Sequence, residues 1–298
     1  MGILARMELP GRLIDPEWLR AQLSSGQPAE DLAVADVRWV PDGHARDGFE
    51  LGHVPGAVCV DVDADLAAPP FHGPGRHPLP DPAAFAATMS RLGIGDGRAV
   101  VAYDDVGGWV AARLWWMLWS LGHAAGVLDL PTLDAWRLAG GTLETGPANP
   151  RHVASFSPAE WPKARLADAR DVRNGLRDGS AVVVDARAAE RYRGETEPFD
   201  PVAGHVPGAV SGPWAGNLDA DGRLLPPPEL RRRFEALGLD GRTDAIAMCG
   251  SGITASAVVF ATELAGLGPA RLYEGSWSDW VSDPARPVAT GPDRGRLS

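Results

Sequence analysis

The sequence predicts an α/β protein of two tandem domains, each a parallel sheet flanked by helices, and three observations lead to this fold class. The chain has 298 residues, whereas a single domain usually contains about 100–200. The string GHVPGA occurs twice, at Gly52–Ala57 and Gly204–Ala209. In each half, short apolar strands alternate with helical stretches, which is typical of a parallel sheet covered on both faces.

The elements before the two GHVPGA copies repeat as well. LAVADVR places Asp36 and an arginine at the end of a strand, and AVVVDAR does the same with Asp185. Because the acidic residue recurs in both halves, we expect Asp36 and Asp185 to have a role in the fold, such as fixing the turn after the strand. His53 and His205, inside the two copies, are interpreted as structural for the same reason.

A second pair of strands follows in each half. SRLGIGDGRAVVAYD ends at Asp104 and EALGLDGRTDAIAMC ends at Cys249, so these two residues match in the repeat. Helices are predicted directly after them, over Gly108–Leu121 and Thr254–Leu267. The second helix meets glycines that suit a left-handed helix end.

A linker is predicted between the halves. The segment Gly140–Trp161 is rich in Gly, Pro, Ser and Asn, which favours an irregular connection. We therefore place the domains at 1–148 and 149–298, with the boundary near Asn149.

The charge and composition of the chain limit the classes of partner that we expect it to bind. A net charge of -11 and a pI near 5.1 argue against a nucleic-acid backbone or an anionic membrane as the main partner. The start of the chain lacks a continuous apolar stretch, and no apolar run reaches the ~18 residues of a membrane span. We expect a cytoplasmic protein. Its two cysteines form no disulfide framework, and nothing in the sequence indicates a metal or an organic cofactor.

The segment CGSGITA carries the chemistry. It places Cys249 at the carboxyl end of a buried strand, where open α/β sheets bind ligands. Gly250 and Gly252 let successive backbone N–H groups converge, and the start of the next helix adds partial positive charge. We expect this ring to stabilise an anion such as a thiolate, whose pKa such a setting lowers from about 8.5, or a persulfide.

Three other readings of this segment compete. A lone cysteine is often a small buried hydrophobe, but between a strand end and the two glycines that follow it has little to pack against. Gly250-x-Gly252-x-x-Ala255 fits a dinucleotide fingerprint with Glu274 downstream, but only 24 residues follow Glu274. Cysteine phosphatases close a similar ring with an arginine six positions after the cysteine, where this chain has Ala255.

The motifs together resemble a known family. They are GHVPGA in both halves, RLWWMLWSLGH (Arg113–His123), RYRGETEPFDP, CGSGITA and LYEGSWSDW. Over nearly its whole length the chain resembles tandem-domain rhodaneses and 3-mercaptopyruvate sulfurtransferases. The resemblance implies that Cys249 takes a sulfane sulfur from a donor, becomes a persulfide and passes the sulfur on. It also implies that the first domain, with Asp104 in place of the cysteine, is non-catalytic. Cys59 follows the first GHVPGA outside such a loop, so we expect it to be structural or incidental.

The resemblance implies a donor site as well. Gly250, Gly252, Ile253 and Thr254 form the loop of the mercaptopyruvate type, which favours 3-mercaptopyruvate over thiosulfate. Arg191, the first arginine of RYRG, matches the family's donor-binding arginine, and its planar fork suits a carboxylate.

One position departs from the family. Mercaptopyruvate enzymes often carry a second arginine where this chain has Phe199. Arg193 and Arg187 are the candidates to replace it.

The mercaptopyruvate branch also has a proposed relay, which maps here onto Asp61, His77 and Ser251. A histidine polarised by a carboxylate is suited to hold or move a proton for a hydroxyl near the reacting sulfur. The structural alternative is that His77 caps a loop and Asp61 ends a strand.

The leading prediction is therefore a sulfurtransferase with a small-molecule sulfur donor. Its acceptor is a thiol, such as thioredoxin or a low-molecular-weight thiol, or cyanide. The alternatives are a thiosulfate-specific enzyme, a persulfide carrier or redox-sensing module without turnover, and a phosphatase-like relative.

Overall fold

The computed structural model describes residues 7–24, 31–39, 45–70, 73–148 and 153–297. The chain divides into two compact units. Unit 1 contains Met1–Leu66, Pro80–Trp161 and Asp221–Arg223, and unit 2 contains Ala67–Leu79, Pro162–Ala220 and Leu224–Ser298. The boundary expected at Asn149 lies outside the described residues.

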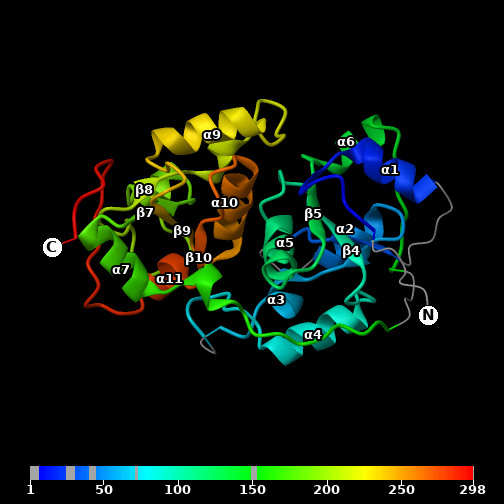
Figure 1. Ribbon diagram of the computed structural model, residues 1–298, viewed down its shortest axis with the longest axis horizontal. Helices are drawn as coiled ribbons and strands as arrows, with labels where there is room; N and C mark the ends of the chain where they lie inside the picture. The colour runs from blue at the N-terminus through cyan, green and yellow to red at the C-terminus, as the bar shows by residue number, and fades with distance from the viewer. Residues whose placement is uncertain (1–6, 25–30, 40–44, 71–72, 149–152, 298) are drawn as a thin grey trace. The chain divides into compact units, whose positions relative to one another are not determined.

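Unit 1 is built on a five-stranded parallel sheet with the order β1-β5-β4-β2-β3. Helices α1 and α6 lie on one side of this sheet and α4 and α5 on the other (Figure 1). The elements are β1 (Leu13–Ile14), α1 (Pro16–Ser24), β2 (Leu32–Asp36), α2 (Ala45–Leu51), β3 (Val58–Cys59), α3 (Val62–Asp65), α4 (Pro82–Arg91), β4 (Ala99–Tyr103), α5 (Ala111–Ser120), β5 (Ala125–Leu128) and α6 (Leu133–Leu138).

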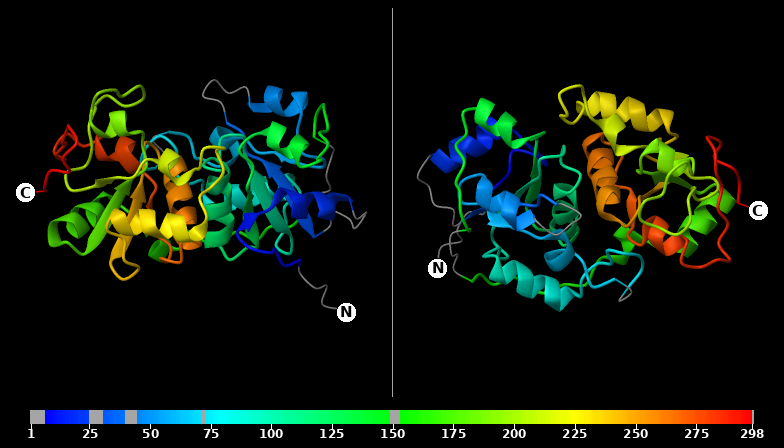
Figure 2. Two further views of the ribbon diagram at one scale, coloured as in Figure 1. Left: turned by 90° about the horizontal axis from the view of Figure 1, so that it is seen from above. Right: turned by 180° about the vertical axis from the view of Figure 1, so that it is seen from behind.

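Unit 2 repeats this architecture with the order β6-β10-β9-β7-β8, again all parallel. Helix α9 lies alongside α10, as both views of Figure 2 show, while α11 packs near α7. The elements are η1 (Lys163–Arg165), β6 (Leu166–Ala167), α7 (Ala169–Asp178), β7 (Ala181–Asp185), α8 (Ala189–Tyr192), β8 (Val210–Ser211), η2 (Trp214–Asn217), α9 (Pro227–Ala236), β9 (Asp244–Met248), α10 (Ile253–Leu264), β10 (Arg271–Tyr273) and α11 (Ser276–Trp280).

The predicted fold class is confirmed in each unit. Every residue of β2 and of β4 is buried, because parallel strands covered on both faces read as continuous apolar runs. The predicted helix at Gly108–Leu121 begins later, at Ala111, since Gly107 and Gly108 both adopt positive φ. Among the described residues, no helix has both the length and the apolar character needed to cross a membrane.

Strand register confirms the repeat that matches Asp104 with Cys249. Asp36 of β2 pairs with Tyr103 of β4, and Asp185 of β7 pairs with Met248 of β9. The next residue after each of these partners is Asp104 or Cys249, so the two occupy equivalent places at the carboxyl ends of their strands.

The paired aspartate and arginine fix the turn after the strand. In unit 2, Arg187 donates from Nη2 to Asp185 Oδ2 at 2.6 Å and to the Gly204 carbonyl at 2.7 Å. In unit 1, Arg38 makes the matching bonds to Asp36 and the Gly52 carbonyl. Because both units carry the same contacts, they belong to the fold rather than to one reaction.

The duplicated histidines have matching surroundings too. His205 Nδ1 lies 2.7 Å from the Tyr192 carbonyl oxygen, and the two rings stack. His53 has the same relationship to Phe49. This agrees with their structural interpretation.

One segment of the first half of the chain belongs to unit 2. Within Ala67–Leu79, the Leu79 amide donates to Glu274 Oε2 at 2.9 Å and the Arg76 amide donates to Ser278 Oγ at 3.1 Å. These bonds fasten the segment next to β10 and α11. This placement brings His77 to the Cys249 loop, as the family resemblance implied, and brings Arg76 there as well, which the sequence motifs did not predict.

Candidate active site

Cys249 follows β9 and is buried, with 3% of its surface exposed. The amide of Gly252 donates to its Sγ at 3.2 Å. Gly252 has φ of +90°, and a Cβ there would lie far inside contact distance of the Glu274 carbonyl oxygen. Only glycine therefore fits this turn, which aims a backbone N–H at the sulfur.

The helix after the loop supplies further donors. Ile253 and Thr254 form the first turn of α10, Ile253 buried and Thr254 half-buried. Amides in a first helical turn have no acceptor within the helix. The N-terminus of α10 therefore favours negative charge on or beside Cys249.

Ser276 holds the backbone of Cys249. Its Oγ accepts from the Cys249 amide at 2.9 Å and donates to the Tyr273 carbonyl at 2.8 Å. The same oxygen lies 3.9 Å from Sγ. Ser276 is fully buried and adopts φ of 50°, an uncommon value for a residue with a Cβ. The hydroxyl of this strained serine thus accepts one hydrogen bond from the backbone and donates another to it.

The matching loop of unit 1 surrounds the carboxyl group of Asp104 with backbone donors; burial raises the pKa of Asp104, and the four amide bonds act to lower it. The buried carboxylate of Asp104 accepts backbone N–H groups of Val106 at 3.0 Å and Gly108 at 2.7 Å on Oδ1. Val110 and Ala111 donate to Oδ2 at 2.8 and 3.0 Å. Gly108, with φ of +85°, donates to the strand-end side chain as Gly252 does in unit 2.

The structure brings two members of the predicted relay together. His77 Nδ1 lies 2.7 Å from Ser251 Oγ, and both residues belong to unit 2. Asp61 belongs to unit 1, where it begins α3 and accepts the amides of Asp63 and Ala64 on Oδ1 at 2.9 and 3.0 Å. Capping a helix is therefore the role that the contacts of Asp61 show.

Arg191 extends from α8 over the loop. A glutamate clamps its guanidinium in the bidentate manner, with Nη2 to Glu197 Oε1 at 2.6 Å and Nε to Oε2 at 3.2 Å. A Cβ added at Gly250 would lie 3.3 Å from both Nη1 and Nη2 of Arg191. The guanidinium therefore faces the space that the missing side chain of Gly250 leaves open.

The two other candidate arginines have different surroundings. Arg193 donates to Glu195 at 2.7 and 2.8 Å near the surface. Arg187 is buried on Asp185, and its guanidinium lies 4.4 Å from the Trp277 ring centroid.

Arg187 nevertheless contributes charge to the site. Burial works to lower its pKa, but the contacts with Asp185 and the charge of Glu197 raise it. The charge of Cys249 adds in the same direction. The fixed cation is therefore within electrostatic reach of the sulfur.

The second cysteine, Cys59, has an environment unsuited to a nucleophile. It ends β3, where burial and nearby carboxylates raise its pKa from 9.0 to about 11. At neutral pH the thiol stays protonated, and the thiolate is the reactive form.

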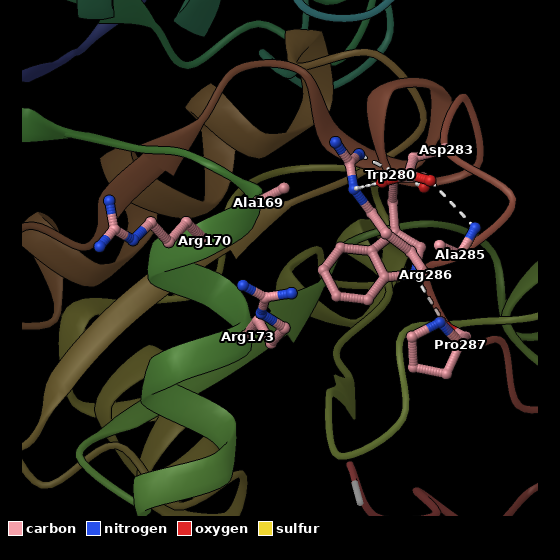
Figure 3. Close-up of a pocket in the computed structure, with 8 residues that line it drawn as sticks. All are labelled: Ala169, Arg170, Arg173, Trp280, Asp283, Ala285, Arg286 and Pro287. Atoms are coloured by element: carbon pink, nitrogen blue, oxygen red, sulfur yellow. Dashed lines mark hydrogen bonds and ion pairs between the residues drawn. The ribbon is translucent and has the colours of Figure 1, made fainter.

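A separate pocket of unit 2 lies between α7 and the chain after α11 (Figure 3). Arg286 donates there to the Asp279 carbonyl and faces Asp283. The lining includes no residue of the Cys249 loop and no other nucleophile, so we assign no sulfur chemistry to it. Its lining residues are Ala169, Arg170, Arg173, Trp280, Asp283, Ala285, Arg286 and Pro287.

Sequence reasoning missed three side chains of the site: Arg76, Glu197 and Ser276. Arg76 Nη2 lies 3.3 Å from the point where a Cβ on Gly250 would stand, as the nitrogens of Arg191 do. Two acidic residues follow RYRG, and the structure pairs Glu195 with Arg193 and Glu197 with Arg191, which the sequence alone does not distinguish. Ser276 lies in the GSWSDW motif, but only the contact with Cys249 distinguishes it from its neighbours.

The sequence is similar to a known protein family and to named relatives. The model of the family described as Rhodanese-like domain matches twice, at residues 15–136 and 168–283. A probable 3-mercaptopyruvate sulfurtransferase of Pseudomonas aeruginosa is 44% identical over 291 residues, which cover 94% of this chain and 98% of the relative. A putative thiosulfate sulfurtransferase, SseB, of Mycobacterium tuberculosis is 38% identical over 94% of this chain and 97% of its own length.

Solved structures of sulfurtransferases are similar to this chain over most of its length. The 3-mercaptopyruvate sulfurtransferase from Leishmania major superimposes with a TM-score of 0.78 at 28% identity, covering 94% of this chain and 75% of that chain. SseA from Escherichia coli superimposes with a TM-score of 0.76 at 29% identity, covering 90% and 99%.

Proposed function

Because the chain belongs to the rhodanese-like family, we propose that Cys249 carries sulfur from 3-mercaptopyruvate to a thiol acceptor. The family resemblance drawn from the motifs is confirmed, and so is the expectation that the protein is a sulfurtransferase. What is proposed is which residues perform the transfer and which donor they accept. The observation that carries it is the Gly252 N–H bond to Cys249 Sγ at the start of α10.

The reaction has two halves. The Cys249 thiolate attacks the thiol sulfur of 3-mercaptopyruvate, the carbon–sulfur bond breaks, and its electron pair stays on the carbon as the enolate of pyruvate. The enolate takes a proton from solvent or a site residue to give pyruvate. An acceptor thiolate then attacks the outer sulfur of the Cys249 persulfide, leaving with that sulfur and restoring the Cys249 thiolate.

Negative charge persists through both halves, and the loop is suited to it. The amides at the start of α10 and the glycine turn are fixed before the reaction, so they need no reorganisation as charge moves between sulfurs. The equivalent loop of unit 1 supports this reading, because four backbone N–H groups converge there on the two side-chain oxygens of Asp104.

His77 and Ser251 form the proton-handling pair of the proposal. Their 2.7 Å contact lets the imidazole hold or accept the hydroxyl proton. Ser251 directly follows Gly250 in the loop. Such a pair is suited to protonate the enolate or to hold the donor carbonyl. Asp61 stays a proposed third member on the strength of the sequence resemblance alone.

The donor choice rests on the loop and on Arg191. CGSGIT carries no basic residue, so the anionic group of the donor meets the planar fork of Arg191, which suits a carboxylate. The acceptor is proposed to be thioredoxin or a low-molecular-weight thiol, with cyanide as a laboratory substitute. Both cysteines are free thiols, which suits a reducing compartment, and we propose the cytoplasm.

The test supplies 3-mercaptopyruvate and thiosulfate separately, with cyanide as acceptor, and measures thiocyanate. Wild type and Cys59→Ser are expected to turn over 3-mercaptopyruvate, whereas Cys249→Ser is expected to be inactive. Intact mass after donor treatment without acceptor should show one added sulfur on wild type and none on Cys249→Ser. Thiocyanate formation that survives Cys249→Ser would contradict the proposal, and a stable persulfide without turnover would favour a carrier instead.

A further inference from the structure

We propose that Arg76 is a second donor-anchoring residue, which together with Arg191 holds the carboxylate and adjacent carbonyl oxygen of a small 2-oxo acid over Gly250. The inference deepens the proposed function and rests on it. Arg76 comes from the segment Ala67–Leu79 of unit 2, which also delivers His77.

Two guanidinium groups converge on one point above the loop. A Cβ at Gly250 would lie 3.3 Å from Nη2 of Arg76 and 3.3 Å from both terminal nitrogens of Arg191. Nη2 of Arg76 therefore lies no more than twice this distance from either terminal nitrogen of Arg191. Gly250 itself follows Cys249 directly, so an anion held between them lies beside the sulfur.

Phe199 lies under both cations. The Arg76 Cζ is 5.5 Å from the ring centroid and the Arg191 Cζ is 5.1 Å from it. A phenyl ring contributes to holding cations through its electron-rich face but forms no salt bridge with them. Phe199, which occupies the expected position of a second arginine, thus supports two guanidinium groups from other segments.

Two carboxylates hold the guanidinium groups of Arg76 and Arg191 in place. Asp200 is buried, with 4% of its side chain exposed; Oδ1 accepts from Arg76 Nη1, and Oδ2 lies 3.8 Å from Arg191 Nη2. Glu197 holds Arg191 from the same loop. These contacts engage Nη1 of Arg76, whereas Nη2 is the nitrogen nearest Gly250.

Asp200 and Glu197 offset part of the repulsion between the two cations, and a bound anion offsets it further. A guanidinium presents five N–H donors in a fixed fork. A 2-oxo acid has a carboxylate and a neighbouring carbonyl oxygen, which are two acceptor groups for two forks. Two anchors also fix the orientation of the donor, which places its sulfur consistently toward Cys249.

The test compares Arg76→Gln and Arg76→Lys with Arg177→Gln, an exposed arginine of α7 that pairs with Asp178. With 3-mercaptopyruvate, Arg76→Gln is expected to raise KM about tenfold or more while kcat changes less than about threefold. Arg76→Lys should fall between wild type and Arg76→Gln, because it keeps the charge but loses the fork. Arg177→Gln should match wild type.

A binding measurement separates this inference from the proposed function. Pyruvate carries the carboxylate and the carbonyl but no sulfur, so its Kd is measured by calorimetry on Cys249→Ser, where no chemistry occurs. Adding Arg76→Gln to Cys249→Ser should raise the Kd for pyruvate about tenfold. If wild type turns over neither donor but pyruvate binding depends on Arg76, the proposed function fails and the 2-oxo acid site survives.

Two results would overturn the inference. One is a KM for 3-mercaptopyruvate and a Kd for pyruvate that both stay within twofold in Arg76→Gln. The other is a KM that rises equally for 3-mercaptopyruvate and for thiosulfate while the Kd for pyruvate stays unchanged. That result would make Arg76 a general source of positive charge. If Arg76→Gln lowers the melting temperature, the same measurements are made on Arg76→Gln/Asp200→Asn, which leaves no unpaired buried carboxylate.

Discussion

His77 and Ser251 are separated by 174 positions in the chain, yet Nδ1 of one lies 2.7 Å from Oγ of the other. The pair is buried in part, beside the nucleophile. A hydrogen bond between an imidazole and a hydroxyl gives each an oriented partner, so we expect the two to act as one group.

The first prediction concerns this pair. Ser251→Ala and His77→Asn are each expected to lower kcat with 3-mercaptopyruvate by about 10- to 100-fold, a usual contribution of a positioned proton-transfer group. Because the two residues act together, the double variant should lose little more than either single variant. Steady-state kinetics on the three variants measure this, and losses that multiply would show that the residues act independently.

Ser276 gives the second prediction through a matched pair of substitutions. Ser276→Ala keeps the left-handed strain and leaves the Cys249 amide without its acceptor, whereas Ser276→Gly relieves the strain and loses the same bond. We expect both to lower kcat, and Ser276→Ala to be less stable than Ser276→Gly by about 1 kcal/mol or more.

Urea unfolding measures the stability difference, and the rate of Cys249 persulfide formation measures the positioning. Equal stability of the two Ser276 variants would show that the φ of 50° stores no strain. Persulfide formation at the wild-type rate in both would show that the bond to the Cys249 amide does not position the sulfur.

Asp104 supports the third prediction, which concerns stability alone. Asp104→Asn replaces one carboxylate oxygen by an N–H₂ group, which faces two backbone donors instead of accepting from them. Each buried polar group left without a partner costs about 1–3 kcal/mol, so we expect a loss of about 2–5 kcal/mol. Denaturant unfolding measures it, with Asp134→Asn, an exposed carboxylate paired with Arg137, as the control that should change little.

Asp104→Asn should leave the donor KM close to that of wild type, because the four hydrogen bonds of Asp104 join it to its own loop and not to the proposed donor residues. A stability loss below about 0.5 kcal/mol would contradict the role assigned to the four amide bonds.

Glu197 gives a prediction about pH. Burial works to raise its pKa, but the hydrogen bond and charge of Arg191, the Phe199 amide and the charge of Arg187 hold it below the ordinary 4.5. A lowered carboxyl pKa contributes stability that is complete above the ordinary value and disappears as pH falls through the lowered one.

Glu197→Gln should therefore be less stable than wild type at pH 7, by about 3 kcal/mol for a broken buried pair. The difference should shrink as pH falls below 4.5. Unfolding curves for both proteins across this range make the measurement. A difference that stays constant down to the acid unfolding of wild type would rule out the charged pair as its source.

Sequence patterns predicted the fold well because the repeat reveals it twice. The strands ending at Asp36 and Asp185 are apolar throughout, and their register with the strands before Asp104 and Cys249 follows from the duplication. Prediction of the helix start after Asp104 was three residues too early, since helix periodicity continues through glycines whose backbone turns the other way.

The candidate site was predictable where a motif carries it and not elsewhere. Cys249 and Arg191 lie in recognisable strings, and the contact of His77 with Ser251 was expected from a resemblance. Arg76 lies beside His77, but its contact with the point above Gly250 depends on how a distant segment folds. No local pattern encodes such a contact.

The placement of Ala67–Leu79 in unit 2 makes the two halves of the chain unequal as building blocks. A polypeptide cut between them would keep the nucleophile in its C-terminal piece while Arg76 and His77 stayed on the other piece. We expect such a truncation to be a poor sulfurtransferase, and co-expressing both pieces to restore activity by fragment complementation. A shortened catalytic piece would therefore have to include Ala67–Leu79 together with the rest of unit 2.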